Sequence, residues 1–281
     1  MNRQTMKALI PKQWLWVLKN IKNLYAHYRT DCYVISYPKC GRTWLRMMLA
    51  KTLALHFKDP QGIVFDPSDV IRKGHYSGPR IRFTHDGAVR PLAIERRQPK
   101  KVYLQYRKKK VIFLIRDPRD ILVSYYFHRS RRMNESHELG SFVRHPWWGA
   151  DRVTAFMKGW YEHRHVPSGF LLVRYEDLHC DPAAVLREIL AFINLCGVSD
   201  EVIRSSVAYA NFENMHRMSL NELRSNYRLA PSNPVDSESF KMRVGKVGGY
   251  AKYLSLADLE FIGERIRCEL PTLFGYADSE R

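Results

Sequence analysis

A lysine stands at the centre of a short turn in the segment "SYPKCGRTW", residues 36–44. A buried-type apolar run ends at Pro38, and helical periodicity resumes after Gly41. Backbone N–H groups at the start of a helix, together with the helix dipole, form a binding site for an anion. Lys39 adds a full positive charge and Thr43 adds a hydroxyl donor, so the turn is typical of a phosphate-binding loop. A solvated turn with a chance lysine is the alternative.

The usual P-loop pattern, G-x-x-x-x-G-K-[ST], does not occur in this sequence. In that pattern the lysine follows the second glycine, whereas here Lys39 precedes Gly41. A P-loop kinase or NTPase also needs a metal-binding aspartate, for which Asp117 is the candidate. This class stays open as an alternative, and so does a non-catalytic module that binds anions or a membrane.

The elements that must position this turn follow from hydrophobic patterning. Buried-type apolar runs predict strands at residues 33–36, 111–115 and 169–175, and a helical pattern follows each of them. Repeated strand–helix units predict an α/β fold, a single P-loop-like domain with a central parallel sheet flanked by helices. In such a sheet the loops after the strands lie at the ligand edge.

Two of the predicted helices carry clear start signals. Asp117 is expected to cap the helix after the second strand, with Pro118 at its first position and Asp120 closing a capping box. Asp181 and Pro182 repeat the cap-and-proline signal after the third strand. The polar segments 134–149 and 217–246 are expected to form long surface loops.

Composition narrows the class of partner. The 281 residues include 46 basic and 28 acidic side chains, a net charge of +18, which favours anionic partners. Five scattered cysteines without a C-x-x-C pair suggest neither a zinc site nor a disulfide framework, and so favour a reducing compartment. No signal-peptide-like or membrane-spanning apolar run occurs, and no nucleic-acid-binding signature is present. We therefore expect a soluble, cytoplasmic protein without a nucleic-acid partner.

Residues 1–30 are expected to form an N-terminal amphipathic helix that precedes the main domain, residues 31–281. Its apolar stripe is expected to pack on the domain core, the common use of such a stripe. A basic helix with tryptophans can instead lie on an anionic membrane, so the alternative is a membrane-peripheral protein. The stripe comprises Leu15, Leu18, Ile21, Leu24 and Tyr25, with Trp14, Lys19, Lys22 and Arg29 around it.

Three segments resemble the signatures of the PAPS-dependent sulfotransferases, in family order. "SYPKCGRTW" resembles the family's phosphosulfate-binding loop, usually written YPKSGTTW. "RDPRDILVSYY" resembles the second signature, and Arg116 and Ser124 match the arginine and serine that hold the nucleotide's 3′-phosphate. "FKMRVGKVGGY" resembles the third signature, F-x-R-K-G-x-x-G-x-W, with matches at Arg243, Gly245 and Gly248.

Smaller matches add catalytic and adenine-side residues. "PRIRFTH" resembles a family segment whose histidine is the catalytic base, and His85 falls on it. "VRYEDL" and "NFENM" resemble segments near the adenine, which places Tyr175 and Phe212 there. The resemblance implies transfer of a sulfuryl group from PAPS (3′-phosphoadenylyl sulfate) to a hydroxyl or amine, without a metal. Lys39 would stabilise the leaving oxygen, and PAP would be the product nucleotide.

The implied nucleotide site is a set of residues from all of these segments, and some depart from the family pattern. Cys40 replaces a serine and Arg42 a threonine, Phe83 stands where a second catalytic lysine is frequent, and Val244 replaces a lysine. A thiol near a helix start can have a lowered pKa, but a serine-like role is expected for Cys40. The set is Lys39, Cys40, Gly41, Arg42, Thr43, Trp44, Arg116, Ser124, Tyr175, Phe212, Arg243, Val244 and Gly245.

The acceptor is the least determined part. Residues 145–152, "HPWWGADR", and the loop at 217–240 are expected to shape its pocket. Aromatic residues there suit a small-molecule, glycan or lipid-type acceptor equally. A lipid-type acceptor would go together with peripheral contact between the enzyme and an anionic membrane.

Overall fold

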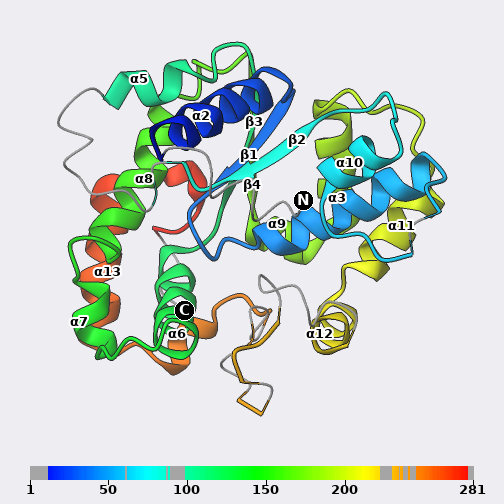
Figure 1. The fold of residues 1–281 in the computed structure, drawn as a ribbon. Coiled ribbons are helices and arrows are strands. Elements are labelled where there is room, and N and C mark those ends of the chain that lie inside the picture. The colour runs from blue at the N-terminus through cyan, green and yellow to red at the C-terminus, as the bar shows by residue number, and fades with distance from the viewer. Residues whose placement is uncertain are drawn as a thin grey trace.

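The computed structural model describes residues 12–60, 62–86, 88, 99–221, 230–233, 235–236, 240 and 245–277. Its centre is a parallel sheet with the strand order β2-β1-β3-β4 (Figure 1). The strands are β1 (Cys32–Ser36), β2 (Ile81–Thr84), β3 (Lys110–Ile115) and β4 (Gly169–Arg174). The predicted α/β fold with a central parallel sheet is confirmed, and the three predicted strands are β1, β3 and β4.

The helices cover both faces of this sheet. Figure 1 shows α6, α8 and α13 on one side and α3, α10 and α11 on the other. In chain order the helices are α2 (Lys12–Tyr28), α3 (Arg42–His56), α4 (Pro67–Lys73), α5 (Pro99–Leu104), α6 (Pro118–Arg132), α7 (Leu139–Val143), α8 (Ala150–Glu162), α9 (Tyr175–Cys180), α10 (Pro182–Phe192), α11 (Asp200–Tyr209), α12 (Phe212–Leu220) and α13 (Leu256–Glu269), with 3-10 turns η3 (Gly249–Lys252) and η4 (Thr272–Phe274).

Strand β2 has no counterpart among the predicted strands, because it is short and Arg82 interrupts its apolar residues. The central strands β1 and β3 are buried apart from the partly exposed Lys110, and they read as apolar runs. In the edge strand β2 only Ile81 is buried, and the other residues are partly exposed. Its sequence, "IRFT", therefore lacks the run that marks a fully covered strand.

The strand register brings the carboxyl ends of the strands to one edge. Strand β1 pairs with β3 from Cys32 opposite Lys110 to Ser36 opposite Leu114. Strand β4 continues the ladder, with Arg174 opposite Ile115. The turn at 37–41, the β3–α6 junction and the start of α9 therefore lie at the same edge of the sheet.

The start of α6 differs in one respect from the prediction. Asp117 caps the helix by accepting the N–H of Arg119 at 2.8 Å. The predicted capping box is wrong, because the Asp117 N–H donates to Glu176 Oε1 at 2.9 Å and not to Asp120. A carboxylate from a helix 59 residues away thus replaces the local partner. The cap of α10 agrees with the prediction, since Asp181 accepts from the third residue of its helix.

Two further expectations need correction. Segment 134–149 is not a loop throughout, because it contains α7, whose Phe142 and Val143 are buried. Most of the other expected loop, 217–246, lies outside the described residues after α12 ends at Leu220. Of the helix expected over residues 1–30, α2 comprises Lys12–Tyr28, and residues 1–11 lie outside the described residues. The apolar stripe at Leu18 and Ile21 does not pack on the core and is at least half exposed.

The turn between β1 and α3 has little room beside α9. Gly41 has a φ of 87°, in the left-handed region that favours glycine. A Cβ atom at this position would lie 2.5 Å from Tyr175 Cδ2 and 2.9 Å from Tyr175 Cε2. Gly41 is therefore required both by its backbone angle and by the ring packed against it.

We predict that Gly41→Ala lowers the free energy of unfolding by at least ~2 kcal/mol, because left-handed strain and a ring collision add. Gly197→Ala is the control for strain, since Gly197 has a φ of 74° and no atom within 4 Å of the added Cβ. Gly62→Ala, in open space outside the left-handed region, should leave stability unchanged. Urea denaturation measures all three, and equal losses for Gly41→Ala and Gly197→Ala would refute the collision.

Candidate functional site

The turn before α3 holds its backbone in an uncommon conformation. Lys39 has a φ of 77°, which a non-glycine residue adopts at a cost and which is frequent at functional sites. Arg42, Thr43 and Trp44 form the first turn of α3, which contains no acidic residue. The first N–H groups of a helix have no acceptor within the helix, so this end is suited to an anion.

Arg116, at the end of β3, ties this turn to two other segments. Its Nη1 donates to the carbonyl oxygen of Lys39 at 3.3 Å, and its Nη2 donates to that of Lys246 at 2.9 Å. Nη2 also lies 3.2 Å from Asp120 Oδ2, and the guanidinium stacks over the Tyr175 ring at 4.2 Å. Its Nε atom is buried and has no hydrogen-bond partner among the described residues. A donor is thus left for a ligand.

Asp120 is a site residue that sequence reasoning missed. Its carboxylate is buried and accepts the N–H groups of Gly248 and Tyr250, each at 3.0 Å. These bonds fasten the loop of the third signature to the start of α6, while Arg116 balances the negative charge. The sequence pattern was explained by a capping role for Asp120 within its own helix. No feature of the neighbouring sequence indicated that Asp120 binds a residue 130 positions away.

Aromatic side chains form one wall next to Arg116. Tyr175 packs edge-on against Trp44 with ring centroids 5.8 Å apart, and Trp44 Nε1 is buried without a partner among the described residues. His179, which sequence reasoning also missed, lies beside both rings and contacts the Gly245 carbonyl through Nε2 at 2.9 Å. Phe212 lies close to Gly245, 2.7 Å from where its Cβ would be. His179 thus links the Trp44 and Tyr175 rings to Gly245, and Phe212 also lies against Gly245.

His85 follows β2 and lies next to the end of β1. Its Nδ1 is 2.9 Å from the carbonyl oxygen of Ser36, the last residue of β1. A carbonyl can only accept, so Nδ1 carries the hydrogen in this contact and the neutral ring has its lone pair on Nε2. This tautomer is the one that a general base at Nε2 needs.

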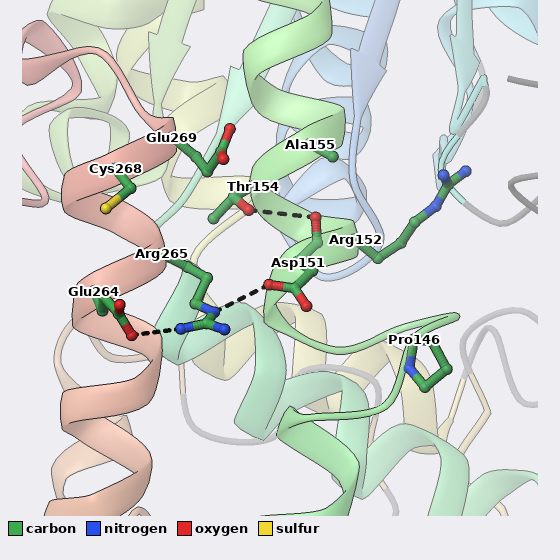
Figure 2. A pocket seen from close by; sticks show the side chains of 9 residues that line it. All are labelled: Pro146, Asp151, Arg152, Thr154, Ala155, Glu264, Arg265, Cys268 and Glu269. Carbon is green, nitrogen blue, oxygen red and sulfur yellow. Dashed lines mark hydrogen bonds and ion pairs between the residues drawn. The ribbon is translucent and has the colours of Figure 1, made fainter. Parts of the chain in front are cut away.

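Arg152 on α8 supports the turn that carries His85. Its Nε donates to the Ala88 carbonyl at 3.3 Å, and the Ala88 N–H closes the turn onto the His85 carbonyl at 2.8 Å. The arginine is 3% exposed, and Figure 2 shows it directed away from the other side chains drawn. An arginine so far along the chain from the "TH" motif gave no sequence signal for this role.

A cavity of about 460 Å³ lies between α8 and α13 (Figure 2). Its lining is charged, and Arg265 Nε pairs there with Asp151 at 3.1 Å. None of the predicted nucleotide-site residues lines it, although Pro146, Asp151 and Arg152 belong to the segment 145–152 that is expected to shape the acceptor pocket. A second cavity, of about 360 Å³, runs along α12 and includes Phe212. We assign the site to the sheet edge, because the chemistry-bearing residues meet there.

Other predicted residues are placed less fully. Ser124 is partly buried on α6, and among the described residues it forms no hydrogen bond with Arg116. Arg243 and Val244 lie outside the described residues. Burial raises the pKa of the Cys40 thiol, so the suggestion of a lowered pKa is wrong, and a neutral thiol suits a serine-like role.

Two largely buried carboxyl groups, those of Glu176 and Asp117, hold together the segments around the β3–α6 junction. Glu176 accepts from the Asp117 N–H and from the Tyr276 hydroxyl, the latter at 2.8 Å, and burial raises the pKa of its carboxyl group. Asp117 pairs with Arg119 at 2.7 Å, although burial still raises the pKa of Asp117. These contacts give Glu176 a structural role. Within the described residues no three potential ligands are grouped to hold a metal ion, and none of the helices has the length and apolar character of a membrane span.

Comparison with known proteins identifies the family of this chain. The model of the sulfotransferase domain matches residues 29–274. A 3-beta-hydroxysteroid sulfotransferase of Cavia porcellus is 29% identical over 264 residues, covering 87% of this chain and 85% of the relative. An amine sulfotransferase of Oryctolagus cuniculus is 25% identical over 253 residues, covering 82% and 77%.

Solved structures agree in fold. Mouse sulfotransferase SULT7A1 complexed with PAP superposes with a TM-score of 0.57 at 18% identity, covering 90% of this chain and 86% of that one. Retinol dehydratase in a complex with retinol and PAP superposes with a TM-score of 0.58 at 20% identity, covering 86% and 81%. The domain match extends over most of the chain and includes the Lys39 turn, His85, Arg116 and the 245–250 loop. This chain belongs to the sulfotransferase family.

Proposed function

We propose that this sulfotransferase takes a sulfuryl group from PAPS and transfers it to a hydroxyl or amine of a small-molecule acceptor. The observation that carries the proposal is the convergence of the strained Lys39 turn, Arg116 and Tyr175 at one edge of the sheet. Two buried donors there, Trp44 Nε1 and Arg116 Nε, have no partner among the described residues. Buried donors are normally satisfied, so a bound nucleotide fits this edge.

The residues of the site divide the work of holding the donor. The start of α3 and Lys39 suit the sulfate-bearing phosphate, because helix dipole and ammonium both favour negative charge. The Arg116 guanidinium suits the 3′-phosphate, with Ser124 and Arg243 as further proposed contacts. Tyr175 and Trp44 form an apolar wall of the kind that packs against adenine.

His85 is proposed as the base. In the transfer, the acceptor atom forms a bond to sulfur while the bond from sulfur to the bridging phosphate oxygen breaks, and that oxygen leaves with the electron pair. His85 Nε2 takes the acceptor's proton, because the contact with Ser36 keeps the hydrogen of the neutral ring on Nδ1. Lys39 is proposed to stabilise charge on the leaving oxygen.

The proposed chemical class of the acceptor is inferred from the names of related enzymes. The names of two of them refer to a hydroxysteroid and to an amine, which supports a small molecule with either group. In the segment expected to shape the pocket, Trp148 is already covered, because His145 stacks on it at 3.5 Å and Arg129 lies 3.9 Å from its ring. Trp147 is 54% exposed and is the aromatic surface that this segment offers to an acceptor.

We predict that PAP raises the melting temperature of the protein while ATP with magnesium has little effect, because Cys40, and not the serine or threonine that binds magnesium in a P-loop, directly follows Lys39. Arg116→Lys keeps the charge but loses the forked donor, so the dissociation constant for PAP should rise about 10- to 100-fold. Thermal denaturation measures the melting temperature and calorimetric titration the dissociation constant. Arg187→Lys is the control, because Arg187 on α10 forms an exposed ion pair with Asp200 on α11. Stabilisation by ATP with magnesium but not by PAP would favour a kinase instead.

We also predict that His85→Asn lowers turnover by at least ~10²-fold and leaves PAP binding unchanged, as expected for loss of a general base. Asparagine keeps an N–H donor for the Ser36 carbonyl but has no basic nitrogen. Transfer from radiolabelled PAPS to hydroxysteroids, phenols and amines measures the effect, and the exposed His165→Asn serves as control. Near wild-type turnover in His85→Asn would place the base elsewhere.

A further inference from the structure

Helix α2 presents large apolar side chains to solvent. At about 100° per residue, five of the residues concerned fall within about a quarter of the helix circumference, and Leu24 borders them. Each is at least half exposed, although such residues normally pack on a core. This solvent-facing stripe consists of Trp14 (56% exposed), Leu18 (50%), Ile21 (58%), Leu24 (70%), Tyr25 (61%) and Tyr28 (77%).

The charge around the stripe has one sign. Residues 1–30 contain no aspartate or glutamate, whereas they contain six lysines and arginines. By helical position, Lys22 and Arg29 follow one border of the stripe, and both are exposed. The Arg29 guanidinium lies 5.9 Å from the Tyr25 ring. Aliphatic residues flanked by aromatic rings and bordered by cations match the boundary between lipid tails and anionic headgroups.

The contacts of α2 with the domain leave the stripe outside. His27 Nδ1 lies 2.7 Å from the Tyr33 hydroxyl, and Lys109 Nζ donates to the carbonyls of Tyr28 and Thr30 at 2.9 and 2.6 Å. These bonds fix the C-terminal end of the helix through the backbone and through His27, which is outside the stripe. The helix is therefore held in place without covering its apolar side chains.

We propose that the α2 stripe docks on the surface of a bilayer that contains anionic phospholipids. The helix lies in the plane of the interface, with the stripe among the upper acyl chains and Lys22 and Arg29 at the headgroups. Because α2 leads directly into the start of β1, it lies at the sheet edge opposite the Lys39 turn (Figure 1). Docking thus leaves the nucleotide edge in water. This proposal does not depend on sulfuryl transfer.

Sedimentation of the full chain with vesicles tests the proposal. We expect binding to vesicles of phosphatidylcholine with phosphatidylglycerol, weakened by salt, and much weaker binding to phosphatidylcholine alone. The triple variant Leu18→Ser, Ile21→Ser and Leu24→Ser should partition at least ~10-fold more weakly, since burial of a single aliphatic side chain is worth about that factor. Leu256→Ser, at an 85% exposed leucine on α13, is the matched control and should bind like wild type.

Melting temperature with and without PAP shows in parallel that each variant is folded and that the nucleotide edge is intact. No binding of the wild-type chain to anionic vesicles, or equal binding by the triple variant, would overturn the proposal. Equal binding to neutral vesicles would remove the requirement for anionic lipid and overturn it as stated. If the wild-type chain is a dimer in solution and the triple variant a monomer, the stripe is an interface between two copies, and the membrane proposal is wrong.

Discussion

Arg116 and Asp120 form a largely buried ion pair at the start of α6, and each also bonds to a different part of the chain. The arginine bonds to the carbonyls of Lys39 and Lys246, and the aspartate accepts from the N–H groups of Gly248 and Tyr250. Breaking a buried pair by removing one partner leaves an uncompensated charge, which typically costs ~3–5 kcal/mol. The geometry of the sheet edge therefore depends on both residues together.

Further buried polar groups connect the segment around this pair to α9, which follows β4. Glu176 connects the β3–α6 junction to the C-terminal segment through Asp117 and Tyr276. Arg119 completes the connection, because its Nη2 donates to the Tyr276 carbonyl at 3.3 Å. Burial of so many charged groups is tolerated because each has an oppositely charged or hydrogen-bonding partner.

Prediction from sequence succeeded where the signal was local. Continuous apolar runs identified β1, β3 and β4. Short motifs singled out the Lys39 turn, Arg116 and Tyr175, which are in contact in the structure, while their roles remain a proposal. Prediction failed where the partner is distant in the chain. Asp120 fitted a capping box from its own helix, yet it binds a loop about 130 residues away, and the α2 stripe fitted a core-facing helix although it is exposed. Periodicity reports that a face is apolar and not what covers it.

The bonds from Asp120 to Gly248 and Tyr250 involve no ligand atom, so this loop is ordered by the protein itself. Fixing a flexible segment on association reduces affinity, because the lost backbone entropy offsets part of the favourable binding free energy. In this protein the backbone entropy of residues 248–250 is lost when the chain folds. A nucleotide bound at the proposed site would therefore meet a preorganised surface, with little loss of affinity from ordering the loop at 248–250.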